Sequence, residues 1–168
     1  MKNTTNWLQR TNLELLWAFS LLTSYTPRFF RYYILKYFIA GILILSGYRR
    51  KVITRNLAKS FPERTSQEIR SLSRRYYSFL AEVIVDTISL VGAKEERKQK
   101  AVNWVNRQEI NDRLDGKDWI AIGAHYGCWE YLPLWSMMQK SNTFMSVYHP
   151  LKSIVFEMFY QRLRKVSD

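Results

Sequence analysis

The stretch IAIGAHYGCWEYLPLW at residues 120–135 contains the most informative polar side chains of the sequence. An apolar run stops at Gly123, and His125 and Glu130 follow among aromatic residues. The run DWIAIGA at 118–124 predicts a buried strand that ends beside the histidine. Open α/β sheets bind ligands at the carboxyl ends of their strands, so we expect a ligand site here. The alternative is that His125 is a core histidine without a chemical role.

His125 and Glu130 together suit the removal of a proton from a hydroxyl group. A neutral imidazole is a good general base at neutral pH, and a nearby carboxylate fixes its tautomer and stabilises the imidazolium. Gly127 permits a tight turn, and a helix expected at 129–139 would point free N–H groups at the same space. The sequence has no Gly-x-Ser-x-Gly motif for a serine acyl-enzyme. Cys128 is an alternative nucleophile, although a lone cysteine in apolar surroundings usually packs.

The composition is that of a folded and strongly basic chain. Of 168 residues, 47% are hydrophobic and 15% aromatic, and 26 Lys plus Arg against 14 Asp plus Glu give a formal charge of +12. This excess favours a polyanionic partner: nucleic acid, anionic lipid head groups or an acidic carrier protein. A single cysteine excludes an intrachain disulfide, and the two histidines lack the spacing of a metal site. No metal or prosthetic group is implied.

Two apolar runs, at 13–22 and 29–48, dominate the beginning of the chain. Arg31 and Lys36 interrupt the second run, and its remainder is shorter than the ~20 apolar residues of a transmembrane helix. Both cations could extend to the membrane interface, and two ordinary core helices are the other alternative. Aromatic ends and a following basic segment favour attachment to a membrane, so we expect residues 1–48 to be membrane-anchoring helices. No signal-peptide cleavage site is evident.

Residues 49–92 are predicted to form a basic amphipathic helical segment. Positions 49–75 contain nine basic and two acidic residues. These charges could be a solvated face, or they could contact lipid phosphates at about 1 kcal/mol each near an anionic surface. Nucleic-acid binding would need aromatic residues that stack on bases. Tyr76 and Phe79 fall on an apolar helix face, where we expect them to pack instead, and no nucleic acid is expected as a partner.

Local signals predict where the helices of this segment begin and end. Pro62 should end the first helix, because proline lacks a backbone N–H group. Thr65 or Ser66 should cap the second helix, with Glu68 completing a capping box. Gly92 is the expected stop of that helix.

Residues 93–168 are predicted to be the first part of an α/β domain. Strands alternating with helices indicate βαβ units and a mostly parallel sheet. Because the sequence ends directly after a helix and contains few strands, we expect this α/β domain to be truncated. The expected strands are at 101–105, 118–124 and 143–148, and the expected helices are at 107–116, 129–139 and 151–166.

Three blocks, RRKVITRNLAKSFPE, GAHYGCWE and VYHPLKSIVFEMFYQRLR, occur in this order. Together they resemble the lauroyl/myristoyl acyltransferase family of lipid A biosynthesis, in the lysophospholipid acyltransferase-like superfamily. Its pattern has an Asn-Leu…Phe-Pro-Glu block, a His-x-Gly-Asn-Trp-Glu block with a His-x4-Asp/Glu catalytic signature, and a Tyr-Arg-Pro block before an arginine-bearing helix. The matching positions are Asn56, Leu57, Phe61, Pro62, Glu63, His125, Gly127, Trp129, Glu130, Tyr148, Pro150 and Arg164, with Arg162 as a neighbouring candidate.

The resemblance implies a membrane-associated acyltransferase at the cytoplasmic face of a bacterial inner membrane. The acyl chain would pass from acyl carrier protein, or from acyl-CoA, to a hydroxyl of a lipid A precursor or related glycolipid. His125 would be the general base for direct attack on the thioester, and Glu130 would orient it. The alternative is a non-catalytic membrane-binding or assembly module with the same fold. The implied substrate-binding residues are Arg164, Arg162, Gly127 and Tyr148.

Two positions depart from the family pattern. Cys128 stands where the family usually has Asn, which changes the hydrogen bonding expected in the turn. His149 stands where the family usually has Arg, which removes a permanent cation for a phosphate or carrier.

Overall fold

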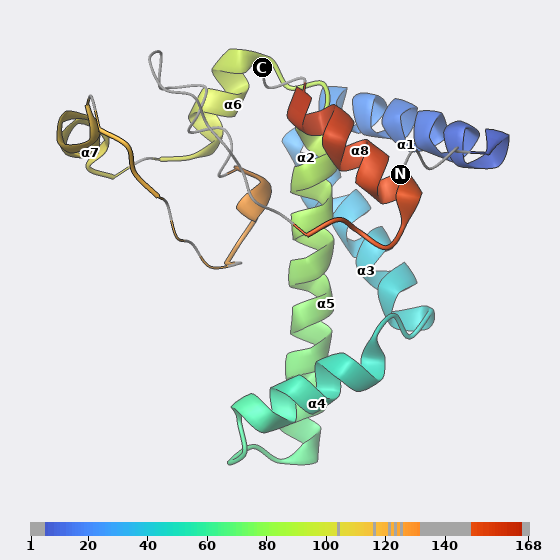
Figure 1. Ribbon diagram of the computed structural model, residues 1–168. Helices are drawn as coiled ribbons and strands as arrows, with labels where there is room; N and C mark the ends of the chain where they lie inside the picture. Colours follow the sequence, from blue (N-terminus) through green and yellow to red (C-terminus); the bar gives the residue numbers. More distant parts are fainter. Residues whose placement is uncertain are drawn as a thin grey trace. The chain divides into compact units, whose positions relative to one another are not determined.

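Helices are the regular elements of both compact units of the chain (Figure 1). The computed structural model describes residues 6–103, 105–115, 117–120, 122, 124, 126–131 and 149–165. Unit 1 comprises Met1–Ala18 with Leu90–Asp168, and unit 2 comprises Phe19–Ser89. In chain order the helices are α1 (Trp7–Tyr25), α2 (Arg28–Phe30), the π-helix η1 (Arg31–Leu35), α3 (Lys36–Leu45), α4 (Arg50–Ser60), α5 (Ser66–Ser89), α6 (Glu95–Ala101), α7 (Arg107–Leu114) and α8 (Ile154–Lys165).

The long helix α5 begins at a reciprocal capping box, which confirms the predicted helix start. The Thr65 backbone N–H donates to Glu68 Oε2 at 2.8 Å, and the Glu68 backbone N–H donates to Thr65 Oγ1 at 3.3 Å. Two N–H groups at the helix start therefore have partners. The preceding helix α4 ends at Ser60, followed by Phe61 and the predicted breaker Pro62. The predicted end of α4 is also confirmed.

A sharp turn joins α3 to α4 in unit 2. Gly47 and Arg49 have left-handed φ angles of 63° and 50°. Glycine adopts such an angle without the steric cost that a Cβ atom adds. The Tyr77 hydroxyl of α5 donates to the Tyr48 carbonyl in this turn at 2.9 Å. The bond fixes the turn against α5. The two helices that the turn joins, α3 and α4, both pack on α5.

The buried stripe of α5 differs from the predicted apolar face. Tyr76 and Phe79, expected to pack, are 39% and 44% exposed. The stripe contains the small residues Ser73 and Ala81, which let a neighbouring helix come closer than a large side chain would. The prediction that Tyr76 and Phe79 pack in the core is therefore wrong. Buried positions at four-residue spacing are Ile69, Ser73, Tyr77, Ala81, Val85 and Ser89.

None of the described helices is by itself long and apolar enough to cross a membrane. The segments Arg28–Leu45 and Arg50–Ser60, bent by 96° to each other, meet the criteria of length and composition only as a pair. Membrane anchoring through residues 1–48 stays a prediction.

In unit 1, α8 packs against the first part of α1. Phe159 is buried, and its ring meets the ring of Trp17 edge-on with 5.7 Å between centroids. Trp17, Leu13 and Leu163 are buried as well. At this contact α1 contributes Leu13 and Trp17, and α8 contributes Phe159 and Leu163. The two residues of each pair are four positions apart, which places them on one face of their helix. The helix predicted at 151–166 is confirmed as α8.

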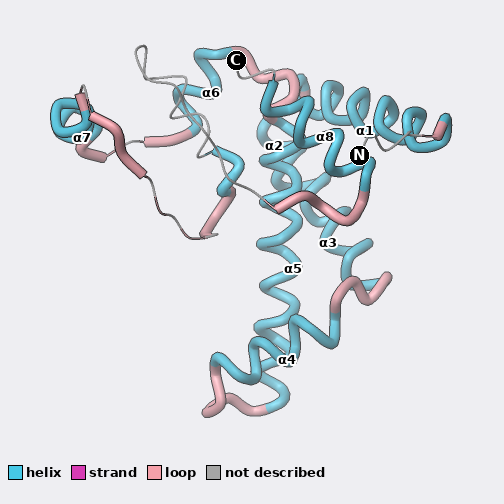
Figure 2. The backbone as a smooth tube through the Cα atoms, viewed as in Figure 1, coloured by secondary structure: helices cyan, strands magenta, loops and turns pink. Residues whose placement is uncertain are grey.

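The predicted α/β class with a mostly parallel sheet is wrong, because the part of the chain that the structure describes contains no strand (Figure 2). In the run 101–105, Ala101 is the last residue of α6. In the run 118–124, Ile120 and Ile122 are 89% and 95% exposed. A strand needs a neighbour that pairs with its backbone N–H and C=O groups. Apolar residues in a run say nothing about whether such a neighbour exists.

Other predicted elements of this region have mixed outcomes. The helix expected at 107–116 is confirmed as α7. The polar stretch at 93–100, for which no element was expected, contains most of α6. Of the helix expected at 129–139, residues 129–131 form one short helical turn, and the rest lies outside the described residues. The strand expected at 143–148 also lies outside them.

Candidate active site

The predicted catalytic acid, Glu130, lies in the short helical turn at 129–131. Gly127 precedes this turn with a left-handed φ of 66°. A Cβ atom at Gly127 would meet nothing within 4 Å, so its backbone angle, not lack of space, favours glycine there. The Tyr131 backbone N–H donates to the Cys128 carbonyl at 3.1 Å and closes the turn. The side chain of Glu130 is only 7% exposed.

Arg164 of α8 provides a positive charge beside this buried carboxylate. Its Nη2 lies 3.8 Å from Glu130 Oε2, and about a third of the Arg164 side chain is exposed. The guanidinium carbon also lies 5.6 Å from the centroid of the Tyr160 ring. A buried carboxylate is costly unless a counter-charge or hydrogen bonds compensate for the lost water. The structure therefore brings two of the predicted site residues together in unit 1.

The second predicted arginine, Arg162, has a different neighbour. Its Nη1 lies 2.9 and 3.0 Å from the two carboxylate oxygens of Glu14 in α1. Its guanidinium carbon lies 4.2 Å from the centroid of the Trp17 ring. Two positions along an α-helix correspond to a rotation of about 200°, so Arg162 and Arg164 project from opposite sides of α8. Glu14 and Trp17 were missed as functional candidates, although Glu14 is the one acidic residue in the apolar run 13–22.

Four other predicted or family-pattern positions have different outcomes. His125 and Tyr148 lie outside the described residues. His149 is exposed, with Nδ1 2.9 Å from the Pro150 carbonyl oxygen. Cys128 is half-buried. Within the described ranges, His, Cys, Asp and Glu side chains form no group that could hold a metal ion.

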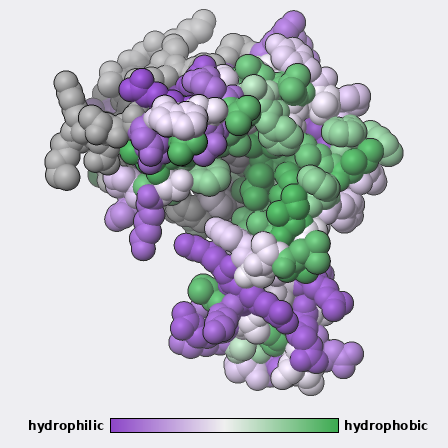
Figure 3. Space-filling model, turned by 90° about the vertical axis from the view of Figure 1, so that its right-hand side faces the viewer, coloured by the Kyte–Doolittle hydropathy of each residue, from purple (hydrophilic) through white to green (hydrophobic). Residues whose placement is uncertain are grey.

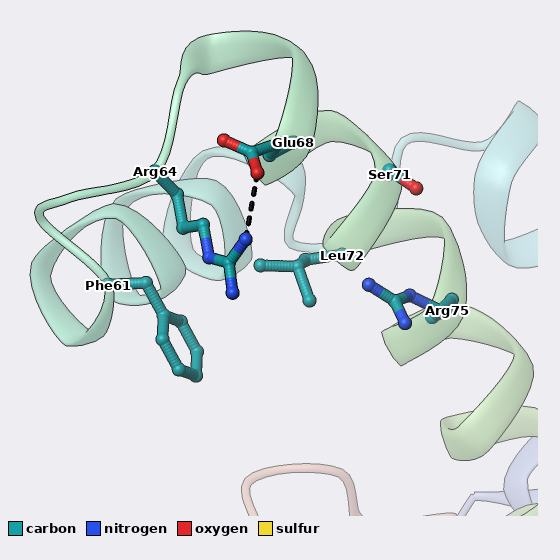
Figure 4. A pocket seen from close by; sticks show the side chains of 6 residues that line it. All are labelled: Phe61, Arg64, Glu68, Ser71, Leu72 and Arg75. Carbon is teal, nitrogen blue, oxygen red and sulfur yellow. Dashed lines mark hydrogen bonds and ion pairs between the residues drawn. The ribbon is translucent and has the colours of Figure 1, made fainter.

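A basic hollow lies in unit 2 where α4 turns into α5. Its volume is roughly 150 Å³, and Figure 4 shows Arg64 and Arg75 on either side of Leu72. Arg64 Nη1 donates to Glu68 Oε1 at 2.8 Å. The backbone N–H of Thr65 and then the Arg64 guanidinium lower the pKa of the Glu68 carboxyl to about 2. The lining residues are Phe61, Arg64, Glu68, Ser71, Leu72 and Arg75.

The two cations inside the second apolar run, Arg31 and Lys36, point inward to neighbouring helices: Arg31 to α1 and Lys36 to α5. Arg31 is buried and its Nη1 donates to the Ser24 carbonyl at 3.4 Å. Lys36 Nζ donates to Glu82 Oε2 of α5 at 2.5 Å. The sequence left open whether these cations extend outward to a membrane interface. In the structure neither of them does. The cost of burying these charges is reduced because each has a polar partner.

The Tyr32 hydroxyl donates a hydrogen bond to Asp86 of α5 next to these residues. Burial, followed by the hydrogen bond to Asp86, raises the pKa of Tyr32 to about 12. Burial also raises the pKa of the Asp86 carboxyl, and this effect outweighs the hydrogen bond from Tyr32. The contact between η1 and α5 is thus polar and partly buried.

From Phe29 to Leu45, many large apolar side chains of α2, η1 and α3 are exposed. In Figure 3, hydrophobic residues lie over α3 and hydrophilic residues gather over α4. Helical spacing of three to four positions brings these side chains onto one broad stripe. We call this stripe the apolar face of unit 2; it consists of Phe29, Phe30, Tyr33, Ile34, Tyr37, Phe38, Ile42, Ile44 and Leu45, which are 39–89% exposed.

Comparison with known proteins gives one family. The family model described as bacterial lipid A biosynthesis acyltransferase matches residues 3–168. No curated protein and no solved structure matches the chain. The family match covers the elements that carry Glu130, Arg164 and Arg162, and it extends over both units.

Proposed function

The chain belongs to the bacterial lipid A biosynthesis acyltransferase family, and from this premise we propose its reaction. It transfers a fatty acyl chain from the thioester of acyl carrier protein, or of acyl-CoA, to a hydroxyl of a lipid A precursor or related glycolipid. The observation that carries the proposal is the buried Glu130 carboxylate with Arg164 3.8 Å away. A carboxylate held in such a place, five positions after a histidine, is suited to support a general base.

In the proposed reaction His125 accepts the proton of the acceptor hydroxyl. The hydroxyl oxygen attacks the thioester carbonyl carbon as its proton passes to the imidazole. The C–S bond then breaks, the ester forms, and the departing thiolate takes the proton back from the imidazolium. No covalent acyl-enzyme is needed. Glu130 fixes the imidazole tautomer and stabilises the imidazolium while the proton resides there.

Arg164 has two functions in this scheme. It compensates for the buried charge of Glu130, and its exposed part presents a cation to anionic groups of the substrate or to the developing oxyanion. Pre-positioned donors at such an oxyanion are typically worth about 3 kcal/mol. The N–H groups around Gly127 and Cys128 lie next to the same turn and are candidates to share this function, and Tyr148 is proposed to bind substrate.

We further propose that the chain works on a membrane surface. The apolar face of unit 2 offers large side chains for insertion between lipids, because Arg31 and Lys36 are turned inward, toward Ser24 of α1 and Glu82 of α5. The basic residues at 49–75 follow directly and can meet lipid phosphates. An acceptor glycolipid would reach the site from the same membrane. The cytoplasmic face of the bacterial inner membrane is the proposed location.

Mass spectrometry of membrane lipids tests this function. Cells carrying the native gene are compared with cells carrying His125→Ala at equal protein level, in a strain without redundant acyltransferases. We expect one glycolipid class to lose a single acyl chain. Arg113→Gln is the matched control, since Arg113 forms an exposed ion pair with Glu109 on α7 of the same unit. Unchanged lipids in the His125→Ala strain would favour the non-catalytic membrane-binding module.

A further inference from the structure

The contact between α8 and α1 includes, besides its buried apolar side chains, one arginine whose partners are both on α1. Arg162 Nη1 reaches both oxygens of Glu14, and the guanidinium lies over the buried ring of Trp17 at 4.2 Å. The side chains of Arg162 and Glu14 are 41% and 65% exposed, so the ion pair alone contributes little. A cation over a tryptophan face adds to it, because tryptophan has the strongest ring quadrupole for this contact. Arg162 therefore joins a charged and an aromatic partner at one point.

The same helix carries Arg164 to Glu130. Phe159 and Leu163 are the buried residues of α8, and Phe159 packs edge-on against Trp17. Trp17 consequently contacts both the apolar side of α8, through Phe159, and the Arg162 guanidinium. A rotation of α8 about its axis would move Arg164, because side chains two positions apart are rigidly related in a helix.

We propose that Arg162 is a positioning residue: its contacts with Glu14 and Trp17 set the rotation of α8 that keeps Arg164 beside Glu130. The inference rests on the proposed acyl transfer and assigns Arg162 a place in it other than substrate binding. Arg162 acts through Arg164 and does not touch the reacting groups. Glu14, in the first apolar run of the sequence, contributes to the same positioning contact.

The two functions of Arg162 predict different effects of a change at Glu14. If Arg162 bound an anionic substrate, Glu14 would compete with that substrate, and Glu14→Gln would leave KM unchanged or lower it. If Arg162 positions α8, Glu14→Gln weakens the contact and lowers kcat, because misplaced groups lose transition-state stabilisation without losing ground-state binding.

The experiment measures kcat and KM of the full chain with an acyl thioester and a glycolipid acceptor for four variants: Glu14→Gln, Arg162→Gln, Arg162→Lys and the Glu14→Gln/Arg162→Gln double variant. We expect kcat to fall about two- to fivefold for Glu14→Gln and about fivefold or more for Arg162→Gln, with KM nearly constant. Arg162→Lys should lie between wild type and Arg162→Gln. The double variant should be no slower than Arg162→Gln, since every effect of Glu14 passes through Arg162.

The control is Glu109→Gln, which breaks an exposed ion pair of 2.7 Å on α7 without touching α8. It should leave kcat and KM unchanged. A rise of KM in Arg162→Gln together with an unchanged or lower KM in Glu14→Gln would overturn the proposal and return Arg162 to substrate binding.

Hydrogen exchange separates a failure of this inference from a failure of the proposed function. In Glu14→Gln and Arg162→Gln, the amides of α8 and of residues 127–131 should exchange faster than in wild type, and those of α7 should not. This readout needs no activity. If wild type shows no His125-dependent transfer, the proposed reaction is wrong while the exchange data still test the positioning contact. Unchanged exchange of α8 in Arg162→Gln would overturn the inference whatever the activity.

Discussion

At the scale of single residues, the environment of Glu130 links the stability of unit 1 to its proposed chemistry. The carboxylate is 7% exposed, and Arg164 lies 3.8 Å away. A buried acid without compensation would bind a proton or unfold the turn that holds it. Here a counter-charge comes from α8, and it is Arg164, the residue that we propose to contact the substrate.

Arg164→Gln should lower the free energy of unfolding by about 1–2 kcal/mol, since Glu130 loses a counter-charge that is itself a third exposed. Combining it with Glu130→Gln should restore most of this loss, because the buried negative charge that Arg164 balances is then gone. Urea denaturation of the two single variants and the double variant checks the prediction. Additive losses would show that the two side chains are not coupled.

The raised pKa of Asp86 predicts that the stability of unit 2 depends on pH. Burial raises the pKa of Asp86 above its ordinary value of 3.8, so the folded state binds the proton more tightly than the unfolded state. Its contribution to stability is fully present below pH 3.8 and is lost as the pH rises through the folded pKa. Asp86→Asn resembles the protonated acid, so its stability relative to wild type should grow as the pH rises through that range.

Urea denaturation at a series of pH values measures this difference. Tyr32→Phe removes the hydrogen bond that lowers the pKa of Asp86, and should shift the loss of stability to higher pH. A difference between Asp86→Asn and wild type that is constant with pH would contradict the account.

At the scale of elements, the start of α5 depends on Thr65. Thr65→Ala removes the hydroxyl that accepts the Glu68 backbone N–H, and should lower the free energy of unfolding by about 1 kcal/mol. Thr65→Ser keeps the hydroxyl and should cost much less. The midpoint of urea denaturation distinguishes the two variants. Equal losses in both would mean that the methyl group of Thr65, and not the cap, stabilises the helix.

The apolar face of unit 2 predicts binding to lipid. Phe38 is 65% exposed on this face, and Phe38→Glu should weaken binding to anionic vesicles about tenfold or more, because it removes apolar area and adds a charge that lipids repel. Flotation with vesicles of mixed neutral and anionic lipid measures the effect. Lys100→Gln is the control for charge, since it also lowers the net charge by one and Lys100 is an exposed residue of α6. Equal weakening by both variants would mean that net charge alone governs binding.

Local signals predicted the elements that local forces determine. Pro62 and the pair Thr65 and Glu68 mark the end of α4 and the start of α5, because these effects act within one helical turn. The predicted sheet failed for the opposite reason: strand pairing joins distant segments, and the exposed Ile120 and Ile122 have an apolar pattern without a described partner. The buried stripe of α5 also depends on which helices approach it.

The same division holds for the candidate site. Glu130 was predicted from the stretch at 120–135 and Arg164 from the resemblance, and the structure brings them together. The contact of Arg162 with Glu14 could not be predicted, since it joins residues 148 positions apart. In the sequence Glu14 is only an acid in an apolar run, and no periodicity connects it to α8.

At the scale of the whole molecule, the family match over residues 3–168 includes both compact units. Unit 1 contains Glu130, Arg164 and Arg162, and unit 2 contains the apolar face and most of the basic segment. A formal charge of +12 suits an anionic membrane and an acidic acyl carrier. Because exposed charges are screened by salt, the proposed membrane binding should weaken as ionic strength rises.

The most direct test of the central claim is acyl transfer by the purified full chain in lipid or detergent. The assay follows the ester product by mass spectrometry, with an acyl thioester donor and a lipid A precursor as acceptor. The account predicts product with wild type, a loss of about a hundredfold or more with His125→Ala or Glu130→Gln, and wild-type rates with Arg113→Gln. Equal product from wild type and both site variants would contradict it.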